Sequence, residues 1–308
     1  MPAGTYNETA KPFFIMSNKI IVGMGEALWD ILPEGRKIGG APANFAYHVS
    51  QFGLESCVVS AIGNDDLGQE IIDSFKEKKL QCLIETVPYP TGTVQVEVDG
   101  AGVPQYRIKE NVAWDNIPFT GKLEALARCT CAVCFGSLAQ RSAVSRETIR
   151  RFIDAMPKSK DTLIVFDANL RQEFFSKDIL DQSIKRCNIL KINDEELVII
   201  SRLLNISETG FQDRCETLLK RYGLKLLILT CGAKGSFVFT PAGTMFFDTP
   251  KVEVADTVGA GDSFTATFIA GLLKGVPVAE AHQRAVEVSA FVCTKQGAMP
   301  ALPEKYMY

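Results

Sequence analysis

A carboxylate stands inside a glycine-rich segment at the start of a long apolar stretch, and this pairing is the strongest chemical signal in the chain. Residues 256–264 read DTVGAGDSF. Gly259, Ala260 and Gly261 leave backbone N–H groups bare at a helix N-terminus, where the helix dipole also attracts an anion. Asp262 would compete with that anion, unless it accepts a proton from a hydroxyl held beside a bound phosphate. The segment alone leaves open a glycine-rich turn with an ordinary first-turn aspartate.

Three further segments have residue types that suit phosphate and magnesium. GGAPAN at residues 39–44 precedes a helical stretch, and TCGAKG at residues 230–235 follows an apolar strand, where small residues would let a nucleotide approach the backbone. Asn193 and Glu196 lie three residues apart at a helix start, placed to hold a hydrated magnesium ion. A capping box is the alternative for this pair, and the pair by itself favours it.

Apolar strand-like runs alternate with amphipathic helical stretches, which is the pattern of a mostly parallel sheet covered by helices. Strands are expected at 19–25, 56–62, 131–136, 162–167, 189–192 and 224–230. Helices are expected at 43–53, 66–79, 145–156, 194–204, 212–222, 259–274 and 278–294. The sequence therefore predicts an α/β fold whose strand ends position the segments above.

One stretch breaks that alternation. Residues 93–98 (TVQVEV) alternate with period two, residues 99–102 are turn-forming, and residues 104–109 can return as a second strand. Residues 31–39 could supply another strand. We expect a small sheet, with segments near 31–41 and 91–111, that covers a site and excludes water from phosphoryl transfer.

Taken together, these segments resemble the PfkB or ribokinase-like family of carbohydrate kinases, over residues 17–303. The first family signature is matched by GGAPANFA at residues 39–46, and the second by DTVGAGD at residues 256–262 with Ala266. Thr267 departs from the family's usual Ala or Gly. The resemblance implies a ribokinase-like three-layer α/β/α sandwich with a mostly parallel central sheet and a small β-sheet lid.

The resemblance also assigns roles. Asp262 would be the general base, and Gly259, Ala260 and Gly261 would form an anion hole for the transferring phosphoryl group of ATP. The remaining roles are Mg²⁺ and phosphate for Asn193 and Glu196 (Glu196 through water), the nucleotide loop for Thr230, Gly232 and Gly235, sugar hydroxyls for Asp30, Gly40 and Asn44, and a monovalent cation such as K⁺ for Asp256.

The substrate is predicted from two runs that look like those of fructokinases, GEALWDILP at residues 25–33 and DANLR at residues 167–171. Asp30 could accept hydrogen bonds from two adjacent hydroxyls. Arg107 and Arg171 could reach the sugar or the phosphates, with a solvated charge and a structural ion pair as the respective alternatives. Fructose is the favoured sugar. The related 2-keto-3-deoxygluconate kinases and ribokinases are alternatives, and a carboxylate substrate would use both arginines.

Other classes of protein fit less well. GMGEAL at residues 23–28 lacks the third glycine of a dinucleotide fingerprint, and no P-loop sequence is present. A non-catalytic sugar-binding or regulatory protein would not need Asp262. Cys129, Cys131 and Cys134 have metal-like spacing, but the apolar run around them favours a buried strand.

Composition limits the partners. Lys and Arg total 33 against 36 acidic residues, so no nucleic-acid partner is expected, and no apolar run suits a membrane span. Nine cysteines without an export signal favour the cytoplasm. Residues 1–16 are predicted to be an N-terminal extension outside a kinase domain at 17–308. The exposed lid sheet predicts a homodimer formed through it.

Overall fold

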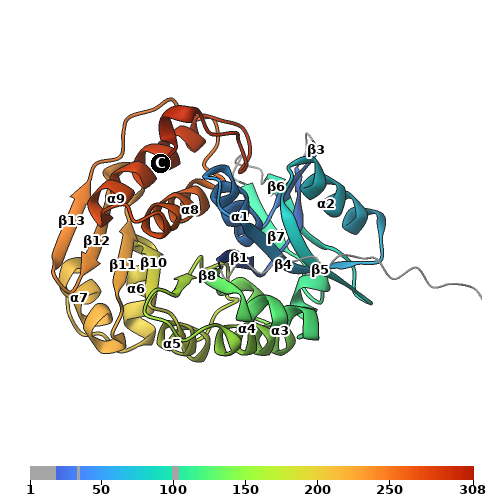
Figure 1. Ribbon diagram of the computed structural model, residues 1–308, viewed down its shortest axis with the longest axis horizontal. Helices are drawn as coiled ribbons and strands as arrows, with labels where there is room; N and C mark the ends of the chain where they lie inside the picture. Colours follow the sequence, from blue (N-terminus) through green and yellow to red (C-terminus); the bar gives the residue numbers. More distant parts are fainter. Residues whose placement is uncertain (1–18, 33–34, 99–103) are drawn as a thin grey trace, which may run out of the picture.

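The computed structural model describes residues 19–32, 35–98 and 104–308. Within these residues a nine-stranded sheet has the order β13-β12-β11-β10-β9-β8-β1-β4-β5 (Figure 1). Its strands are β1 (Ile20–Met24), β4 (Ser56–Gly63), β5 (Gln81–Val87), β8 (Thr130–Phe135), β9 (Leu163–Asp167), β10 (Ile189–Asn193), β11 (Leu226–Thr230), β12 (Ser236–Thr240) and β13 (Gly243–Phe247). The sheet is parallel from β5 to β11, and β12 and β13 add an antiparallel edge.

Helices cover both faces of this sheet, because its central strands are apolar on both sides. β1 and β4 are buried along their whole length. The helices are α1 (Ala41–Gln51), α2 (Asp66–Glu77), α3 (Gly121–Arg128), α4 (Ala143–Ala155), α5 (Lys177–Arg186), α6 (Asp194–Leu203), α7 (Phe211–Tyr222), α8 (Ala260–Leu273) and α9 (Val278–Cys293). Short 3₁₀ turns lie at Ala113–Asn116, Leu138–Gln140, Gly232–Lys234 and Glu304–Tyr306.

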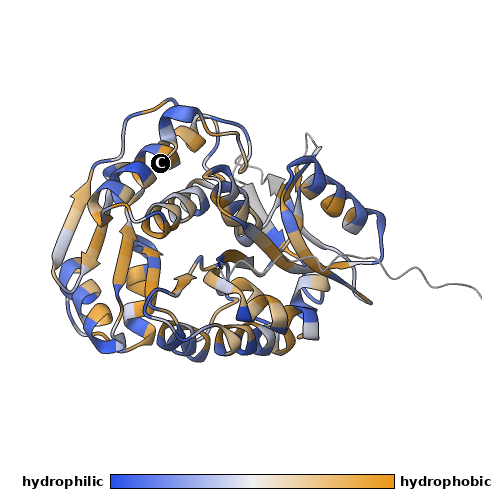
Figure 2. Cartoon of the chain, in the orientation of Figure 1, coloured by the Kyte–Doolittle hydropathy of each residue, from blue (hydrophilic) through white to orange (hydrophobic). Residues whose placement is uncertain are grey.

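Two apolar layers separate the sheet from its helices. Buried residues of α3 to α7 pack on one face, and those of α1, α8 and α9 pack on the other (Figure 1). Figure 2 shows the same division as apolar strands inside and polar residues on the outer sides of the helices. The three-layer α/β/α sandwich expected from the sequence is confirmed.

A second sheet projects beside α1 and α2. Its order is β3-β2-β6-β7, from β2 (Leu28–Leu32), β3 (Gly35–Gly39), β6 (Gly92–Val98) and β7 (Pro104–Ile108). Trp29 and Ile31 pack into a cluster with α1 and α2. Since side chains alternate along a strand, Asp30 lies on the other face of this sheet.

The described chain confirms the small sheet and divides the single strand expected at residues 31–39 into two, β2 and β3. The turn expected at 99–102 and the extension expected at 1–16 lie outside the described residues. Cys131 and Cys134 lie in β8, all nine cysteines are free, and no metal-binding cluster of His, Cys, Asp or Glu occurs in the described chain. No helix of the described ranges has the length and apolar character to cross a bilayer.

Candidate active site

The N-terminus of α8 forms one wall of the candidate site. Gly259 caps this helix in the left-handed conformation, with φ 77°. A Cβ at this position would lie 2.7 Å from Ala298, so both the backbone angle and the close approach require glycine. The glycine-rich turn predicted at Gly259, Ala260 and Gly261 is therefore present at the start of a helix, where an anion can bind. The Ala260 N–H donates to the Thr257 carbonyl oxygen over 3.3 Å in this structure.

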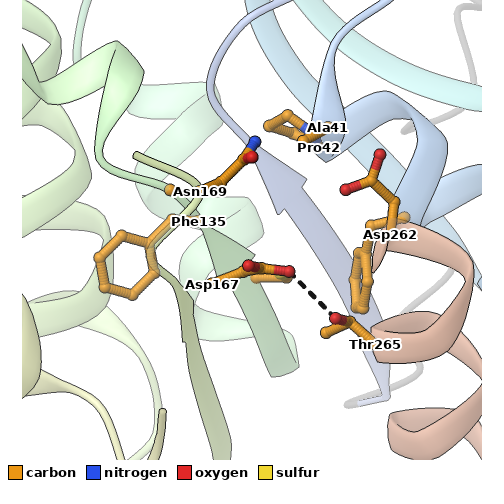
Figure 3. Close-up of a pocket in the computed structure, with 10 residues that line it drawn as sticks. Ala41, Pro42, Phe135, Asp167, Asn169, Asp262 and Thr265 are labelled. Atoms are coloured by element: carbon orange, nitrogen blue, oxygen red, sulfur yellow. Dashed lines mark hydrogen bonds between the residues drawn. The ribbon is translucent and has the colours of Figure 1, made fainter. Parts of the chain in front are cut away.

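Asp262 lies in the first turn of α8 and faces the start of α1 (Figure 3). Asn44, in α1, donates a hydrogen bond from Nδ2 to Asp262 Oδ2 over 2.7 Å. Burial and the nearby charge of Asp167 together raise the pKa of Asp262 to about 6, against the opposing effect of the Asn44 hydrogen bond. The structure thus joins two predicted site residues that stand 218 positions apart.

A small pocket adjoins Asp262, between α1, α8 and the ends of β8 and β9 (Figure 3). Its lining residues are Ala41, Pro42, Phe45, Cys134, Phe135, Gly136, Asp167, Asn169, Asp262 and Thr265. The site therefore lies at the carboxyl ends of parallel strands, where open α/β sheets bind their ligands.

Two more carboxyl groups and one arginine face the same region. Burial raises the pKa of Asp30 to about 6 and that of Glu26 to about 7, while the positive charge of Arg171 lowers both. Arg171 also lowers the pKa of Asp262, so its exposed guanidinium is electrostatically coupled to all three. Glu26 was not predicted. It is 3% exposed, and its Oε2 has no hydrogen-bond partner among the described residues.

The predicted nucleotide loop follows β11. Thr230 ends that strand and pairs in register with Asn193 at the end of β10. Gly232 begins the 3₁₀ turn, and Gly235 follows it. The loop therefore opens beside the start of α6, as expected for a segment that a nucleotide approaches.

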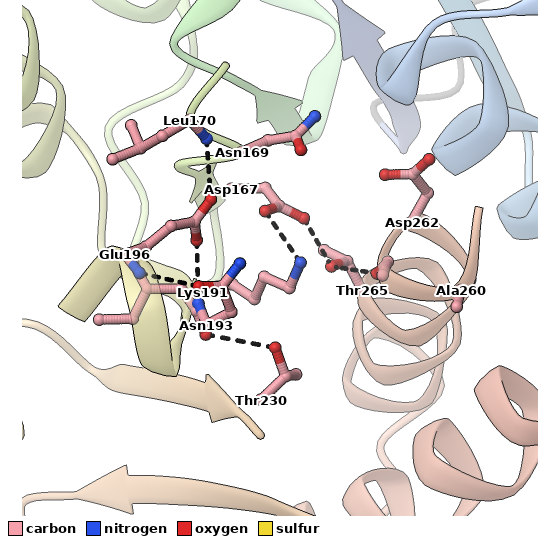
Figure 4. Close-up of polar contacts among 12 residues, drawn as sticks. Asp167, Asn169, Leu170, Lys191, Asn193, Glu196, Thr230, Ala260, Asp262 and Thr265 are labelled. Carbon is pink, nitrogen blue, oxygen red and sulfur yellow. Dashed lines mark hydrogen bonds and ion pairs between the residues drawn. The ribbon is translucent and has the colours of Figure 1, made fainter. Parts of the chain in front are cut away.

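Asn193 and Glu196 form a capping box. Asn193 Oδ1 accepts the Glu196 N–H over 2.8 Å, and Glu196 Oε2 accepts the Asn193 N–H over 2.9 Å. The second carboxylate oxygen, Oε1, accepts the N–H of Leu170 over 2.8 Å (Figure 4). Since backbone groups engage both oxygens, these residues fit a Mg²⁺ ion that binds mainly through phosphates and water.

Two predicted residues are placed less centrally. Arg107 lies on β7 with an exposed side chain. The Asp256 carboxylate accepts the N–H groups of Val258 and Gly297, each over 3.0 Å, and one oxygen lies 3.9 Å from Lys37 Nζ. The carboxylate is thus already engaged, so the K⁺ site stays a prediction and no chemical step depends on it.

A buried chain of polar contacts beside the start of α8 was not identified from the sequence. Lys191 Nζ contacts Asp167 Oδ1 over 3.0 Å, and the other carboxylate oxygen lies 3.0 Å from the Thr265 hydroxyl (Figure 4). The signal was a lysine inside the apolar run ILKIN of β10. A charge between buried aliphatic residues needs a partner, and here the partner is Asp167.

Comparison with known proteins agrees with this geometry. The sequence profile of the pfkB family carbohydrate kinases matches residues 34–305. The chain belongs to this family. It is therefore a carbohydrate kinase, and the sugar-kinase class expected from its two signatures is confirmed.

Individual pfkB relatives carry several substrate names. An ATP-dependent 6-phosphofructokinase from Thermoanaerobacterium thermosaccharolyticum is 29% identical over 86% of this chain and 82% of its own. A fructokinase from Salmonella typhimurium is 28% identical, over 94% of this chain and 97% of its own. The substrate within the family is thus not fixed by these likenesses.

Solved structures show the same fold. A fructokinase from Xylella fastidiosa with bound ATP has a TM-score of 0.80 at 22% identity, over 93% of this chain and 95% of that one. A fructokinase from Vibrio cholerae, in a fructose, ADP and potassium ion bound form, has a TM-score of 0.76 at 23% identity, over 94% and 96%.

Proposed function

We propose that this pfkB kinase is a fructokinase that transfers the γ-phosphoryl group of ATP to a hydroxyl of D-fructose, with Asp262 as the general base. The observation that carries the proposal is the placement of Asp262 against both Asn44 and the bare N-terminal turn of α8. A carboxylate with a pKa of about 6 is ionised at neutral pH and is a stronger base than an ordinary aspartate.

The transfer step follows from this placement. The fructose hydroxyl oxygen forms a bond to the γ-phosphorus as the bond to the β–γ bridging oxygen breaks, and ADP leaves with that electron pair. Asp262 accepts the hydroxyl proton. The N–H groups around Gly259, Ala260 and Gly261 stabilise the charge on the transferring group.

ATP would lie along Thr230, Gly232 and Gly235, with its γ-phosphoryl group at the anion hole. Asn193 and Glu196 would hold Mg²⁺ through water, and the ion would neutralise phosphate charge. We expect the small sheet to act as a lid that excludes water, since it carries Asp30 on β2, and Asp30 is close enough to Arg171 and Asp256 to interact with their charges.

The sugar assignment is supported by the Asp30 carboxylate, which can accept hydrogen bonds from adjacent hydroxyls, together with Gly40 and Asn44 at the start of α1. One observation favours a second candidate, a 2-keto-3-deoxygluconate kinase. Arg171 is a positive charge coupled to Asp30 and Asp262, and it would bind a sugar carboxylate directly.

A substrate panel tests these alternatives. ATP-dependent phosphorylation would be measured with fructose, ribose, 2-keto-3-deoxygluconate, adenosine and fructose 6-phosphate, each with Mg²⁺. The highest kcat/KM with fructose is expected. A preference for the sugar acid or for fructose 6-phosphate would instead give Arg171 the specificity role, and would overturn the fructose assignment without affecting the base.

A further inference from the structure

Lys191 points toward α8 from within an apolar surface. It lies in β10 between Leu190 and Ile192, which pack on the opposite face of the sheet in the layer of α3 to α7. Ile189 packs in the layer that contains α8. Because strand side chains alternate, Lys191 shares the face of Ile189 and extends under the start of α8 (Figure 4).

The ammonium group lies against the anion-hole backbone. A Cβ built on Gly261 would stand 2.9 Å from Lys191 Nζ. Gly261 is not among the positive-φ residues, so its backbone angle does not require glycine. A side chain at position 261 would instead displace the Lys191 ammonium group from its place beside the turn.

Negative charge exceeds positive charge around this group. The carboxylates of Asp167 in β9, Glu196 in α6 and Asp262 in α8 all act electrostatically on the Lys191 ammonium group. Asp167 is the hydrogen-bond acceptor that the described residues offer to its three N–H donors. At 8% exposure, the other donors have little access to water.

We propose that Lys191 is a catalytic cation that contacts the transferring phosphoryl group from inside the anion hole. Its ammonium donates to a non-bridging γ-phosphoryl oxygen as that oxygen approaches the turn of Gly259, Ala260 and Gly261. It offsets the repulsion that Asp262 and Asp167 would exert on the phosphate, and Asp167 holds it in place. The inference rests on the proposed role of this site in phosphoryl transfer.

The alternative is that Lys191 and Asp167 form only a structural ion pair. Replacing both charged residues by neutral ones distinguishes a catalytic role from a structural one. The loss of both partners of a buried ion pair is often harmless to stability, whereas the loss of one partner is not. The test variant combines Lys191→Met with Asp167→Asn, which keeps an acceptor for the Thr265 hydroxyl. Asp167→Asn alone is the matched control that retains the ammonium group.

We expect the double variant to melt near the wild-type temperature and to bind ADP, which lacks the γ-phosphoryl group, with unchanged affinity. Its kcat should fall by about 100-fold, the typical effect of losing one oxyanion donor. Asp167→Asn alone should be less stable than the double variant and yet turn over faster. A folded double variant with wild-type kcat would overturn the proposal.

Two further variants keep the role of Lys191 testable if the double variant does not fold. If the double variant is unfolded, Lys191→Gln replaces it, since the amide still donates to Asp167 without carrying a charge, and the same loss of kcat is expected. Lys191→Arg keeps the charge and should retain more activity than Lys191→Gln. If fructose is not the acceptor, the sugar that wild type phosphorylates fastest is used, so a failed fructose assignment leaves the test of Lys191 intact.

Discussion

Asp262 must be ionised to act as the proposed general base, and its surroundings oppose ionisation. Burial and the nearby Asp167 raise its pKa, and the Asn44 amide compensates only in part. Replacing Asp262 by Asn keeps the shape and removes both the base and the buried charge. We expect kcat to fall by about 100-fold or more, in line with general-base contributions.

Steady-state kinetics and ATP binding by calorimetry would check this change. The variant should bind ATP at least as tightly as wild type, because a negative charge beside the γ-phosphate is gone. Turnover close to the wild-type value would mean that another group accepts the proton.

The pH dependence follows from the same carboxyl group. The base works only when deprotonated, so kcat/KM should decline as the pH falls through about 6. The groups that face Asp262 and influence it are Asp167, Lys191, Arg171 and Glu26. A pH–rate profile measures the apparent pKa of this cluster of groups. A profile that stays flat down to about pH 4.5 would contradict the assignment of Asp262 as the general base.

The contribution of Asp262 to folding stability should change with pH in the opposite direction to kcat/KM. A raised carboxyl pKa in the folded protein means that the folded state holds the proton more tightly, so its contribution is greatest below the ordinary value of 3.8 and is lost as pH rises through about 6. Asp262→Asn should therefore melt at a higher temperature than wild type at neutral pH, and the gain should shrink toward about pH 4. Thermal melts across this range would test it. A constant difference would indicate that the charge does not matter.

At this scale, sequence reasoning found the residues whose types are unusual for their place, such as Asp262 among glycines. It missed Lys191 and Glu26. The roles of these two residues depend on their neighbours in space, on another strand or beyond a turn. A local sequence pattern does not reveal those neighbours. Lys191 was visible only as a charge in an apolar strand, and its partner Asp167 lies in the neighbouring strand.

At the scale of elements, the start of α8 depends on one backbone conformation. Gly259→Ala forces a Cβ into a left-handed residue and against Ala298. Gly275 has nearly the same φ, 78°, with nothing within 4 Å of its hypothetical Cβ, so Gly275→Ala is the matched control.

We expect Gly275→Ala to cost about 1–2 kcal/mol of stability, the usual penalty for this conformation, and to leave kcat unchanged. Gly259→Ala should cost more and should also lower kcat, because the anion-hole N–H groups must shift. Chemical denaturation and kinetics would separate the two effects. Equal costs and equal activities would show that the Ala298 contact is unimportant.

The elements that sequence reasoning predicted best are the central strands and the helices with a clear apolar stripe. It missed β5, β12 and β13 and helices α3 and α5. β5 is only half-buried and β13 is largely exposed, and α5 (KDILDQSIKR) contains few apolar residues. The structure of such segments is determined by the strands they pair with or the sheet they cover. The local sequence pattern therefore predicts them poorly.

For the whole molecule, the small sheet leaves β3 and β7 as edges. We expect two copies of the chain to associate through their small sheets, because the unpaired backbone groups of an edge strand can pair with a strand of another copy. Sedimentation velocity at assay concentration should show a dimer, and a species that remains monomeric at the highest soluble concentration would count against it.

The small sheet also contacts the segments that flank the start of α8. Lys37 of β3 donates to Gln296 over 3.3 Å and lies 3.9 Å from Asp256. The small sheet is thus linked directly to the segment that leads into α8.

The contacts that complete the site join the two ends of the described chain. Asn44 meets Asp262, and buried His48 lies 2.8 Å from the carbonyl oxygen of Ala298, which itself abuts Gly259. A nascent chain emerging from the ribosome therefore holds α1 without these partners until translation has passed Asp262 and Ala298. A chain terminated before residue 262 would lack both the proposed base and the partner of the Asn44 amide.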